Sequence, residues 1–434
     1  MSLFSDQIGL LGSENAFKIG PLIKKAEELL DQKIIRCNLG EPDFKTPAFI
    51  KEEVKRQLDN DNTHYVDPQG ILSLREAIAK HTNETHKLSV TAEQVVVFPG
   101  GKPPIGFCEQ VYLNPGDEII YPSPGYPIYE SFAKYVKAVP VPLHLSEEKG
   151  FSFDGEDLAK LITPKTKMII LNFPSNPTGG VASLESLTAI AEVIKEKCNS
   201  DVRIYSDEIY EDIVFDGAKS NSIASIAGMS ERTIIVNGVS KNCSWTGGRV
   251  GWAILPTVEE AQVLKNLNIN YFSCVSAYNQ EGARVALESP QEQEFINEMK
   301  TAFQERRDLV VAGLNEIEGI KCQLPKGAFY VFPNISGVCE QLGILAAYDS
   351  LADDLKKRTT PSTLFQMFLL FKYGVATMDR KAFGSIGQEG KHYLRLSIAT
   401  AKTDLQEAVE RIRKASTDKT SFQEFLNKGE YLFY

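Results

Sequence analysis

The chain has 434 residues, of which 43% are hydrophobic and 24% are charged, as in ordinary globular proteins. This length favours two domains over one. The net charge of -10, from 47 Lys plus Arg against 57 Asp plus Glu, argues against a broad nucleic-acid interface.

The cysteines, histidines and apolar runs restrict the class of protein further. Seven scattered cysteines without a Cys-x-x-Cys pair are typical of reduced thiols. The first residues do not have the pattern of an export signal, and the longest apolar run, near residues 364–371, is far too short for a membrane span. The five histidines lack the spacing of metal ligands. We therefore expect a cytoplasmic protein without a metal site, and neither nucleic acid nor a membrane as its partner.

Amphipathic helices are predicted at three places in the first half of the chain. Residues 21–30 place apolar side chains on one helical face, with Pro21 at the expected first helical position. The same periodicity recurs at 70–81 and at 183–197, where Ser183 is a candidate N-cap.

Five short runs between these helical patterns are rich in β-branched and aliphatic residues. They are VVVF at 95–98, EIIY at 118–121, MIIL at 168–171, RIYS at 203–206 and TIIV at 233–236. Runs that are continuously apolar indicate strands buried on both faces. Together with the helices, they predict an α/β fold with a mostly parallel central sheet covered by helices on both faces.

The last third of the chain has a different pattern. A helical pattern around residues 294–314 precedes GAFYVF at 327–332, and HYLRLSIA follows at 392–399. This order predicts a smaller α+β domain, completed by the N-terminal helix. The stretch 335–372 and the tail after residue 416 receive no assignment.

Each of the five predicted strands is followed by polar or glycine-rich residues. These clusters are Gly100 to Lys102, Pro122 to Tyr126, Asn172 to Gly179, Asp207 to Tyr210, and Ser240 with Lys241. Ligands in α/β sheets bind beyond the carboxyl ends of the strands, so the clusters predict one shared site.

The residue types at these strand ends suit one small molecule. A lysine forms an imine with an aldehyde, a carboxylate holds a proton on a ring nitrogen, and a tyrosine and an asparagine bind a ring hydroxyl. A glycine turn and an arginine suit a phosphate. Pyridoxal 5′-phosphate (PLP) needs all of these groups, and we predict it as the cofactor.

Eight motifs between Leu39 and Lys414 carry a family resemblance. They are LGEPDF (39–44), LREAIA (74–79), GGK (100–102), NPTGG (176–180), SDEIYE (206–211), SKNCSWTGGRVGW (240–252), GAFYVF (327–332) and YLRLSIA (393–399). With them the chain resembles the fold-type-I aminotransferases of class I and II, nearest the aspartate aminotransferase subgroup. The resemblance implies a homodimer with composite active sites. It also implies an N-terminal arm and helix at 1–45 that join the small domain, a large PLP-binding domain at 46–300 and a small C-terminal domain at 301–434.

The resemblance assigns roles to the residues that would hold the cofactor. Lys241 is the catalytic residue, both Schiff base and proton shuttle, and its environment must lower the usual lysine pKa of about 10.4 for it to react. Asp207 pairs with the pyridine nitrogen, while Tyr210 and Asn176 bind the ring hydroxyl. Arg249 and the backbone at Gly101 and Lys102 bind the phosphate, Tyr126 stacks on the ring, and Tyr65 reaches the cofactor phosphate of the neighbouring subunit. For Tyr126 a plain core tyrosine is the alternative, and for Tyr65 an ordinary interface or core tyrosine.

Other residues are implied to contact the substrate. Arg395 binds the α-carboxylate as a bidentate fork, helped by the backbone at Gly40, with Tyr126 and Asn176 beside it. Lys102 meets the distal carboxylate of acidic substrates, with a plain surface lysine as the alternative. The chain departs from the family at three places. Pro103 and Pro104 replace Gln-Ala, Gly238 replaces a phosphate-binding serine, and Gly248 replaces a frequent tryptophan.

The resulting hypothesis is transamination between an L-amino acid, with aspartate favoured, and a 2-oxo acid, with 2-oxoglutarate favoured. Alanine or aromatic amino acids are the alternative substrates. A PLP lyase or decarboxylase on the same fold is a rival class. A PLP-sensing regulator is the non-enzyme alternative, although no basic helix-turn-helix segment precedes Leu39.

Overall fold

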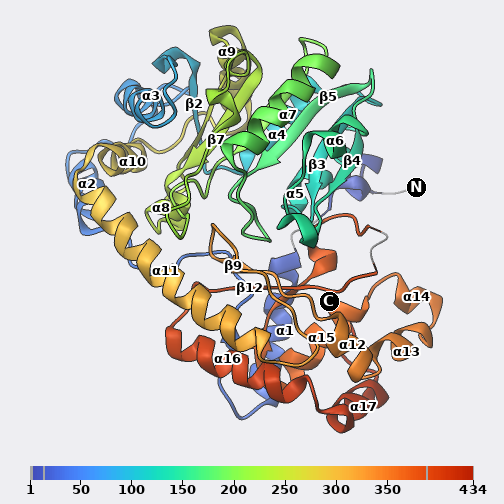
Figure 1. Cartoon of the computed structure of the whole chain (residues 1–434). Coiled ribbons are helices and arrows are strands. Elements are labelled where there is room, and N and C mark those ends of the chain that lie inside the picture. Colours follow the sequence, from blue (N-terminus) through green and yellow to red (C-terminus); the bar gives the residue numbers. More distant parts are fainter. Residues whose placement is uncertain (1–2, 13–14, 388–389, 434) are drawn as a thin grey trace.

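A mixed seven-stranded sheet is built from the middle of the chain in the computed structural model, which describes residues 3–12, 15–387 and 390–433 (Figure 1). The strands are β2 (Val95–Phe98), β3 (Glu118–Ser123), β4 (Val139–His144), β5 (Thr166–Asn172), β6 (Arg203–Asp207), β7 (Thr233–Gly238) and β8 (Gly251–Ile254), in the order β2-β8-β7-β6-β5-β3-β4. Only β8 runs against its neighbours. The five predicted strands are confirmed.

Two strands of this sheet were not predicted from the sequence. β4 is an edge strand that contains Pro140 and Pro142, and proline is tolerated there because an edge strand leaves one row of backbone groups without ladder bonds. β8 is only four residues long and begins at a glycine, so its sequence pattern is too short to be recognised.

Helices cover both faces of the sheet, as predicted. In β2, Val96 and Phe98 point to one face, whereas Val95 and Val97 point to the other, because side chains alternate along a strand. The first face packs against α4 (Pro103–Tyr112), α5 (Pro127–Tyr135) and α9 (Val258–Tyr271). The second face packs against α2 (Ala48–Asp59), α3 (Leu72–His86), α7 (Leu184–Lys197) and α10 (Ala277–Glu288), with α6 (Gly155–Ala159) beside α7. The Ser183 hydroxyl caps α7 by accepting the Ser186 N–H.

The N-terminal segment pairs with the C-terminal third of the chain. β1 (Ile35–Arg36) runs parallel to β10 (Val375–Ala376). Before it lies α1 (Asn15–Leu29), so the expectation that Pro21 starts this helix is wrong. Ile19 and Ile23 are both buried on one helical face, so packing extends the helix across the proline. The predicted arm from residue 1 and the tail to residue 434 lie in part outside the described residues.

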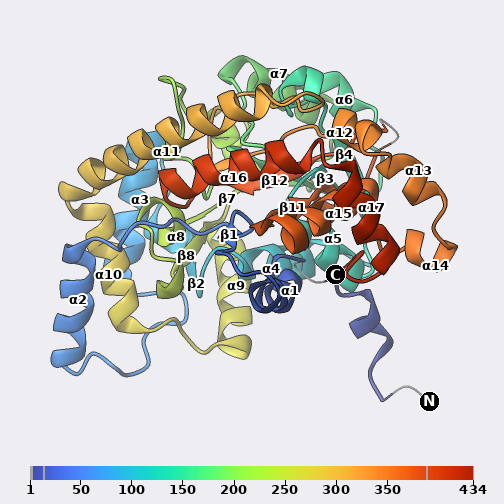
Figure 2. The same cartoon turned by 90° about the horizontal axis from the view of Figure 1, so that it is seen from below.

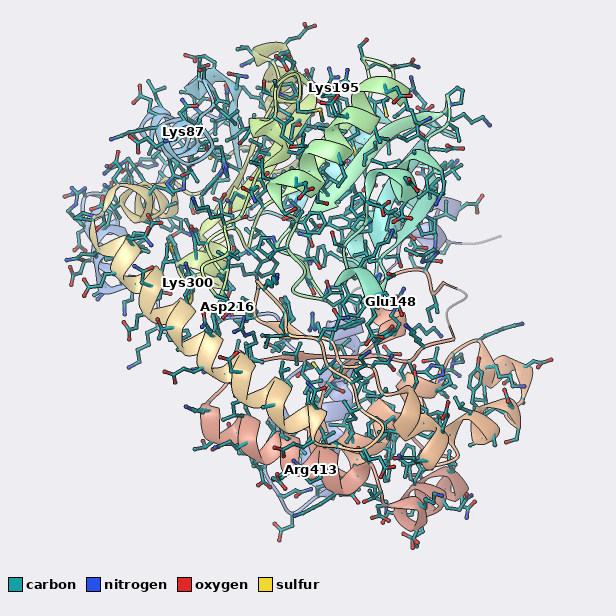
Figure 3. The ribbon with its side chains drawn as sticks, in the orientation of Figure 1. Lys87, Glu148, Lys195, Asp216, Lys300 and Arg413 are labelled. Atoms are coloured by element: carbon teal, nitrogen blue, oxygen red, sulfur yellow. The ribbon has the colours of Figure 1, made fainter. Side chains whose placement is uncertain are left out.

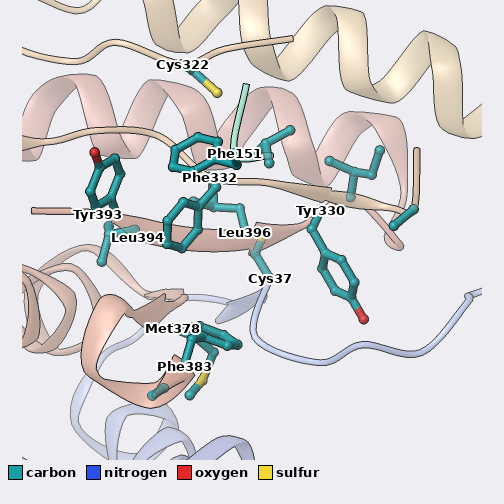
Figure 4. Close-up of a cluster of buried hydrophobic side chains, with 14 of the residues drawn as sticks. Cys37, Phe151, Cys322, Tyr330, Phe332, Met378, Phe383, Tyr393, Leu394 and Leu396 are labelled. Atoms are coloured by element: carbon teal, nitrogen blue, oxygen red, sulfur yellow. The ribbon is translucent and has the colours of Figure 1, made fainter. Parts of the chain in front are cut away.

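A three-stranded antiparallel sheet forms the centre of the C-terminal third. Its order is β11 (Met378–Asp379), β12 (Leu394–Ser397) and β9 (Tyr330–Val331). Phe332, just after β9, stacks on Tyr393, just before β12, with ring centroids 5.0 Å apart, and Figure 4 shows this cluster of buried side chains. The Tyr330 hydroxyl points away from the cluster (Figure 4).

A long helix, α11 (Gln291–Asn315), connects the region of the large sheet to the C-terminal third (Figure 1). It lies alongside α16 (Lys402–Ala415) in both views (Figure 2). Arg307, which is 1% exposed, forms a two-pronged ion pair with Asp216, labelled in Figure 3, at 2.7 and 3.0 Å. This ion pair fixes the middle of α11 to the loop that follows β6.

The stretch 335–372 and the tail, which the sequence left unassigned, form helices that pack on one another. These helices are α12 (Ser336–Gln341), α13 (Ile344–Asp349), α14 (Asp353–Lys356), α15 (Pro361–Phe368) with a π-helical turn at Leu369–Tyr373, and α17 (Lys419–Lys428). Phe422 and Phe425 of α17 contact the Phe368 ring at centroid distances of 5.2 and 5.8 Å. The tail is therefore part of a core.

Short 3-10 turns complete the described elements at Asp6–Leu10, Ala92–Gln94, Glu147–Lys149, Ile223–Ser225, Ser230–Arg232, Thr246–Gly248 and Arg380–Phe383. Among the residues that the structure describes, no helix combines the length and the apolar character that a membrane crossing requires.

Candidate active site

One edge of the large sheet gathers the polar clusters that follow its strands. β2, β3, β5, β6 and β7 are parallel, so their carboxyl ends lie at the same edge. β8 is antiparallel, so its start, just after Arg249, lies at this edge too. β12 contributes Arg395 from the smaller sheet, and the loop after β1 contributes Gly40.

A cavity of about 550 Å³ lies between these elements. Ten of the eleven residues predicted for the site line it: Gly40, Gly101, Lys102, Tyr126, Asn176, Asp207, Tyr210, Lys241, Arg249 and Arg395. The exception is Tyr65, which is 86% exposed and does not line the cavity of its own chain.

Lys241 lies on α8 (Val239–Asn242), a single helical turn that follows β7 directly. Its Nζ donates a hydrogen bond to the Gly40 carbonyl oxygen at 2.5 Å. The same atom lies 5.9 Å from the Tyr210 ring centroid and 5.8 Å from that of Phe329. The amine thus lies between residues that follow the seven-stranded sheet and residues next to the three-stranded sheet. Side chains from both sheets can contact a molecule bonded to the amine.

Asp207 is the last residue of β6 and is 7% exposed. Its Oδ2 accepts a hydrogen bond from the Tyr129 hydroxyl at 2.6 Å, and its Oδ1 accepts the Ile209 N–H at 3.3 Å. Burial raises the pKa of Asp207 to about 6, against the opposing effects of these hydrogen bonds and of the Lys241 charge. A cationic ring nitrogen would favour the carboxylate form further.

Asn176, Tyr210 and Arg395 meet beside Lys241. The Arg395 guanidinium donates to Asn176 Oδ1 at 3.2 Å and stacks over the Tyr330 ring, 4.6 Å from its centroid. The Tyr210 and Tyr330 hydroxyls are hydrogen-bonded at 2.7 Å. A buried arginine and two phenols therefore surround the place where a carboxylate beside the lysine would lie.

Arg249 packs directly on the glycine turn after β2. Its guanidinium donates to the carbonyl oxygens of Thr246 and Pro99. A Cβ at Gly100 would lie 2.2 Å from this guanidinium, and Gly100 has a φ of +94°, so only glycine fits there. Since α4 begins just after Lys102, a guanidinium and a helix N-terminus converge at this turn, as phosphate binding requires.

The residues present fit PLP. The set contains an amine, an acidic group for the ring nitrogen, an amide and a phenol for the ring hydroxyl, and a glycine turn with an arginine for the phosphate. Tyr126 lines the cavity, and the Lys102 Nζ lies over its ring at 5.7 Å from the centroid.

Two departures from the family have a steric explanation. A Cβ at Gly238 would lie 2.8 Å from the Gly251 Cα, so a serine would require this backbone to move. A Cβ at Gly248 would lie 2.3 Å from the Trp245 ring, which already fills the space of a larger side chain. Pro103 is the first residue of α4, a position where proline suits a helix.

A buried ionic cluster joins the end of α3 to the segment that carries Asp207 and Tyr210. The His86 Nε2 is 2.9 Å from Glu211 Oε2 and 3.4 Å from Glu208 Oε2. Burial disfavours the imidazolium, but the hydrogen bond to Glu211 and the charges of Glu208, Glu211 and Asp212 outweigh it and raise the pKa of His86 to about 9. His86 therefore anchors the two residues adjacent to the ring-binding groups.

Replacing His86 with Gln is expected to lower the free energy of unfolding by about 3 to 5 kcal/mol, because two buried carboxylates lose their cation. The folded pKa lies above the unfolded value of about 6.5, so the contribution is complete below that pH and is lost as pH rises through about 9. Urea unfolding at pH 6 and pH 9.5 measures this. His144 is exposed, and His144→Gln is therefore the control. Equal stability of the two variants at pH 6 would refute the stabilising role of His86.

Sequence reasoning missed two tyrosines of the site. Tyr129 lies three residues after Tyr126, the residue that precedes α5, and both line the cavity. This helical spacing could have identified Tyr129 from the sequence. Tyr330 lies in the quoted motif GAFYVF, but its contact with Tyr210 joins residues 120 apart in sequence. No local pattern predicts that contact.

The chain belongs to the aminotransferase class I and II family, whose model matches residues 32–412. This family uses pyridoxal phosphate. The chain is 38% identical over 394 residues to the probable aspartate/prephenate aminotransferase of Aquifex aeolicus, which covers 90% of this chain and 93% of that protein. It is 35% identical over 389 residues to aromatic-amino-acid aminotransferase 2 of Thermococcus litoralis, covering 89% of this chain and 92% of that protein.

Solved structures have the same fold. The crystal structure of the aspartate aminotransferase from Rhizobium meliloti superposes with a TM-score of 0.85 at 32% identity, covering 96% of this chain and 99% of that one. The predicted fold class and enzyme class are therefore confirmed.

Proposed function

We propose that this aminotransferase moves the amino group of an L-amino acid, with aspartate favoured, to a 2-oxo acid, with 2-oxoglutarate favoured. The observation that carries the proposal is the convergence of Lys241, Asp207, Arg249 and Arg395 on one cavity. For the donor, the support is Lys102, whose ammonium lies at this cavity and suits a distal carboxylate.

Each residue of the cavity has a proposed task. PLP, when bound, supplies an aldehyde that bonds to an amine and a ring that withdraws electrons from the substrate α-carbon. Lys241 Nζ holds the cofactor covalently between turnovers and takes the proton from the substrate α-carbon. Asp207 keeps the ring nitrogen protonated, and Asn176 and Tyr210 bind the ring hydroxyl. Tyr126 stacks on the ring, and Arg249, with the backbone at Gly101 and Lys102, holds the phosphate.

The substrate is oriented by its α-carboxylate. Arg395 presents a planar fork that matches this group. Two of its present partners are the Asn176 side-chain oxygen and the Asn38 carbonyl oxygen, and we place the substrate carboxylate beside them. The Gly40 carbonyl accepts a hydrogen bond from Lys241, and the backbone at Gly40 is proposed to help Arg395 orient the same carboxylate.

We further propose a homodimer and the domain limits 1–45, 46–300 and 301–434. The exposed Tyr65 supports the dimer, since its phenol is available to reach the cofactor phosphate at the partner subunit's site. The pairing of β1 with β10 supports an N-terminal segment that joins the small domain. A cytoplasmic location is proposed from the seven free cysteines.

A spectral titration of the PLP-loaded protein with aspartate, glutamate, alanine and phenylalanine tests the donor. We expect aspartate and glutamate to convert the cofactor to its amine form at lower concentrations than alanine or phenylalanine. Lys102→Met should weaken the response to aspartate about tenfold and leave alanine unchanged. A stronger response to phenylalanine than to aspartate would refute the acidic preference, and no response to any amino acid would refute transamination.

A further inference from the structure

We propose that Tyr129 is a positioning residue whose hydroxyl holds Asp207 as an oriented carboxylate. In this way Tyr129 would increase the affinity of the site for a protonated ring nitrogen. The inference rests on the proposed function, because the nitrogen belongs to the proposed cofactor. It concerns a residue outside the motifs that carry the family resemblance.

The contact between the two side chains is short and buried. The Tyr129 hydroxyl lies 2.6 Å from Asp207 Oδ2, and Tyr129 is 0% exposed. This distance is typical of a hydrogen bond from a hydroxyl to a charged carboxylate, which is stronger than one between neutral groups. Since Oδ1 accepts the Ile209 N–H, both carboxylate oxygens are fixed by a donor.

The surrounding rings hold the Tyr129 side chain in place. It packs edge-to-face against Tyr126 at 5.7 Å and against Tyr205 at 6.4 Å between ring centroids. Tyr126 and Tyr129 both line the cavity, so the ring expected to stack on the cofactor also braces the ring that holds Asp207.

Asp207 needs this support because it is buried. Burial raises its pKa to about 6, and three groups oppose that rise: the Tyr129 hydroxyl, the Ile209 N–H and the Lys241 charge. The Asp207 charge also acts on the phenols of Tyr205 and Tyr210, and burial raises the pKa of both well above the ordinary tyrosine value. They stay neutral phenols. Without the Tyr129 hydroxyl the pKa of Asp207 rises further, and a neutral carboxylic acid holds a cation poorly.

A closely matched control lies next to Tyr129. Tyr205 is also a fully buried tyrosine of the same core cluster, and it lies on the strand that ends at Asp207. Its hydroxyl has no hydrogen-bond partner among the described residues. Tyr205→Phe therefore removes a buried phenol oxygen close to Asp207 without removing a hydrogen bond to it.

The experiment measures equilibrium binding of PLP and of its 1-deaza analogue, in which carbon replaces the ring nitrogen, to the apoproteins at pH 7.5. The affinity ratio of the two compounds isolates the contact with Asp207 from all other contacts. We expect Tyr129→Phe to lower this ratio about tenfold or more, mainly through PLP, and Tyr205→Phe to leave it unchanged. Replacing Tyr129 with 3-fluorotyrosine nearly keeps the shape and makes a stronger donor, so this variant tests the contact even if the phenylalanine variant does not fold, and its ratio should differ from that of the wild type.

The outcomes separate the two proposals. A wild-type ratio in Tyr129→Phe, an equal loss in Tyr205→Phe, or an unchanged ratio with 3-fluorotyrosine would overturn the role of Tyr129 alone. A wild-type protein that binds neither compound would overturn the proposed cofactor site and this inference with it.

Discussion

Lys241→Ala is expected to lower kcat by at least about 10⁴-fold, since both the covalent attachment and the proton transfer at the substrate α-carbon depend on one amine. Steady-state transamination between aspartate and 2-oxoglutarate measures this loss. The variant should unfold at a similar temperature to the wild type, because the Lys241 amine lies at the cavity and its hydrogen bond to the Gly40 carbonyl joins it to a loop.

The control for this variant is Lys195→Ala. Lys195 is exposed and pairs with Glu192 on the surface of α7, so its loss should change neither kcat nor stability measurably. A Lys241→Ala enzyme that keeps more than a tenth of the wild-type kcat would show that another group carries the chemistry.

The second large effect is expected from Arg395→Lys, which keeps the charge and removes the planar fork. Loss of a two-pronged contact with the substrate α-carboxylate should lower kcat/KM by about 30-fold or more, corresponding to roughly 2 kcal/mol or more of transition-state binding. Cofactor absorbance should be unchanged, because Arg395 acts on the substrate.

Arg411→Lys is the matched control for Arg395. Arg411 donates to the backbone carbonyls of Lys33 and Tyr373, as Arg395 donates to that of Asn38, but it does not line the cavity. Similar losses of kcat/KM in the two variants would indicate a structural role for both arginines and contradict the assignment of Arg395 to the substrate.

Much of the sheet could be predicted because its strands are buried on both faces and have continuous apolar sequences. The clusters after these strands were grouped into one site for a topological reason, since parallel strands end at one edge. The prediction failed where packing overrides local sequence. Pro21 lies inside a helix because Ile19 and Ile23, on either side of it, are buried, and the edge strand β4 contains two prolines.

The site was less predictable where contacts join distant segments. Asp207 ends a strand and Lys241 follows one, and both could be identified from their motifs. The Tyr210–Tyr330 and Arg395–Asn176 contacts instead connect the large sheet to the three-stranded sheet across long sequence separations. Tyr65 was predicted from the resemblance alone, and its role depends on a second subunit. The packing of α17 on α15 depends on aromatic contacts between segments that show no motif.

The most direct measurement is borohydride reduction of the PLP-loaded protein followed by peptide mapping of the phosphopyridoxyl label. We expect a single labelled peptide that contains Lys241, and no label in Lys241→Ala. A label on Lys102 or on any other lysine of the wild type, or a protein that takes up no label, would contradict the central claim.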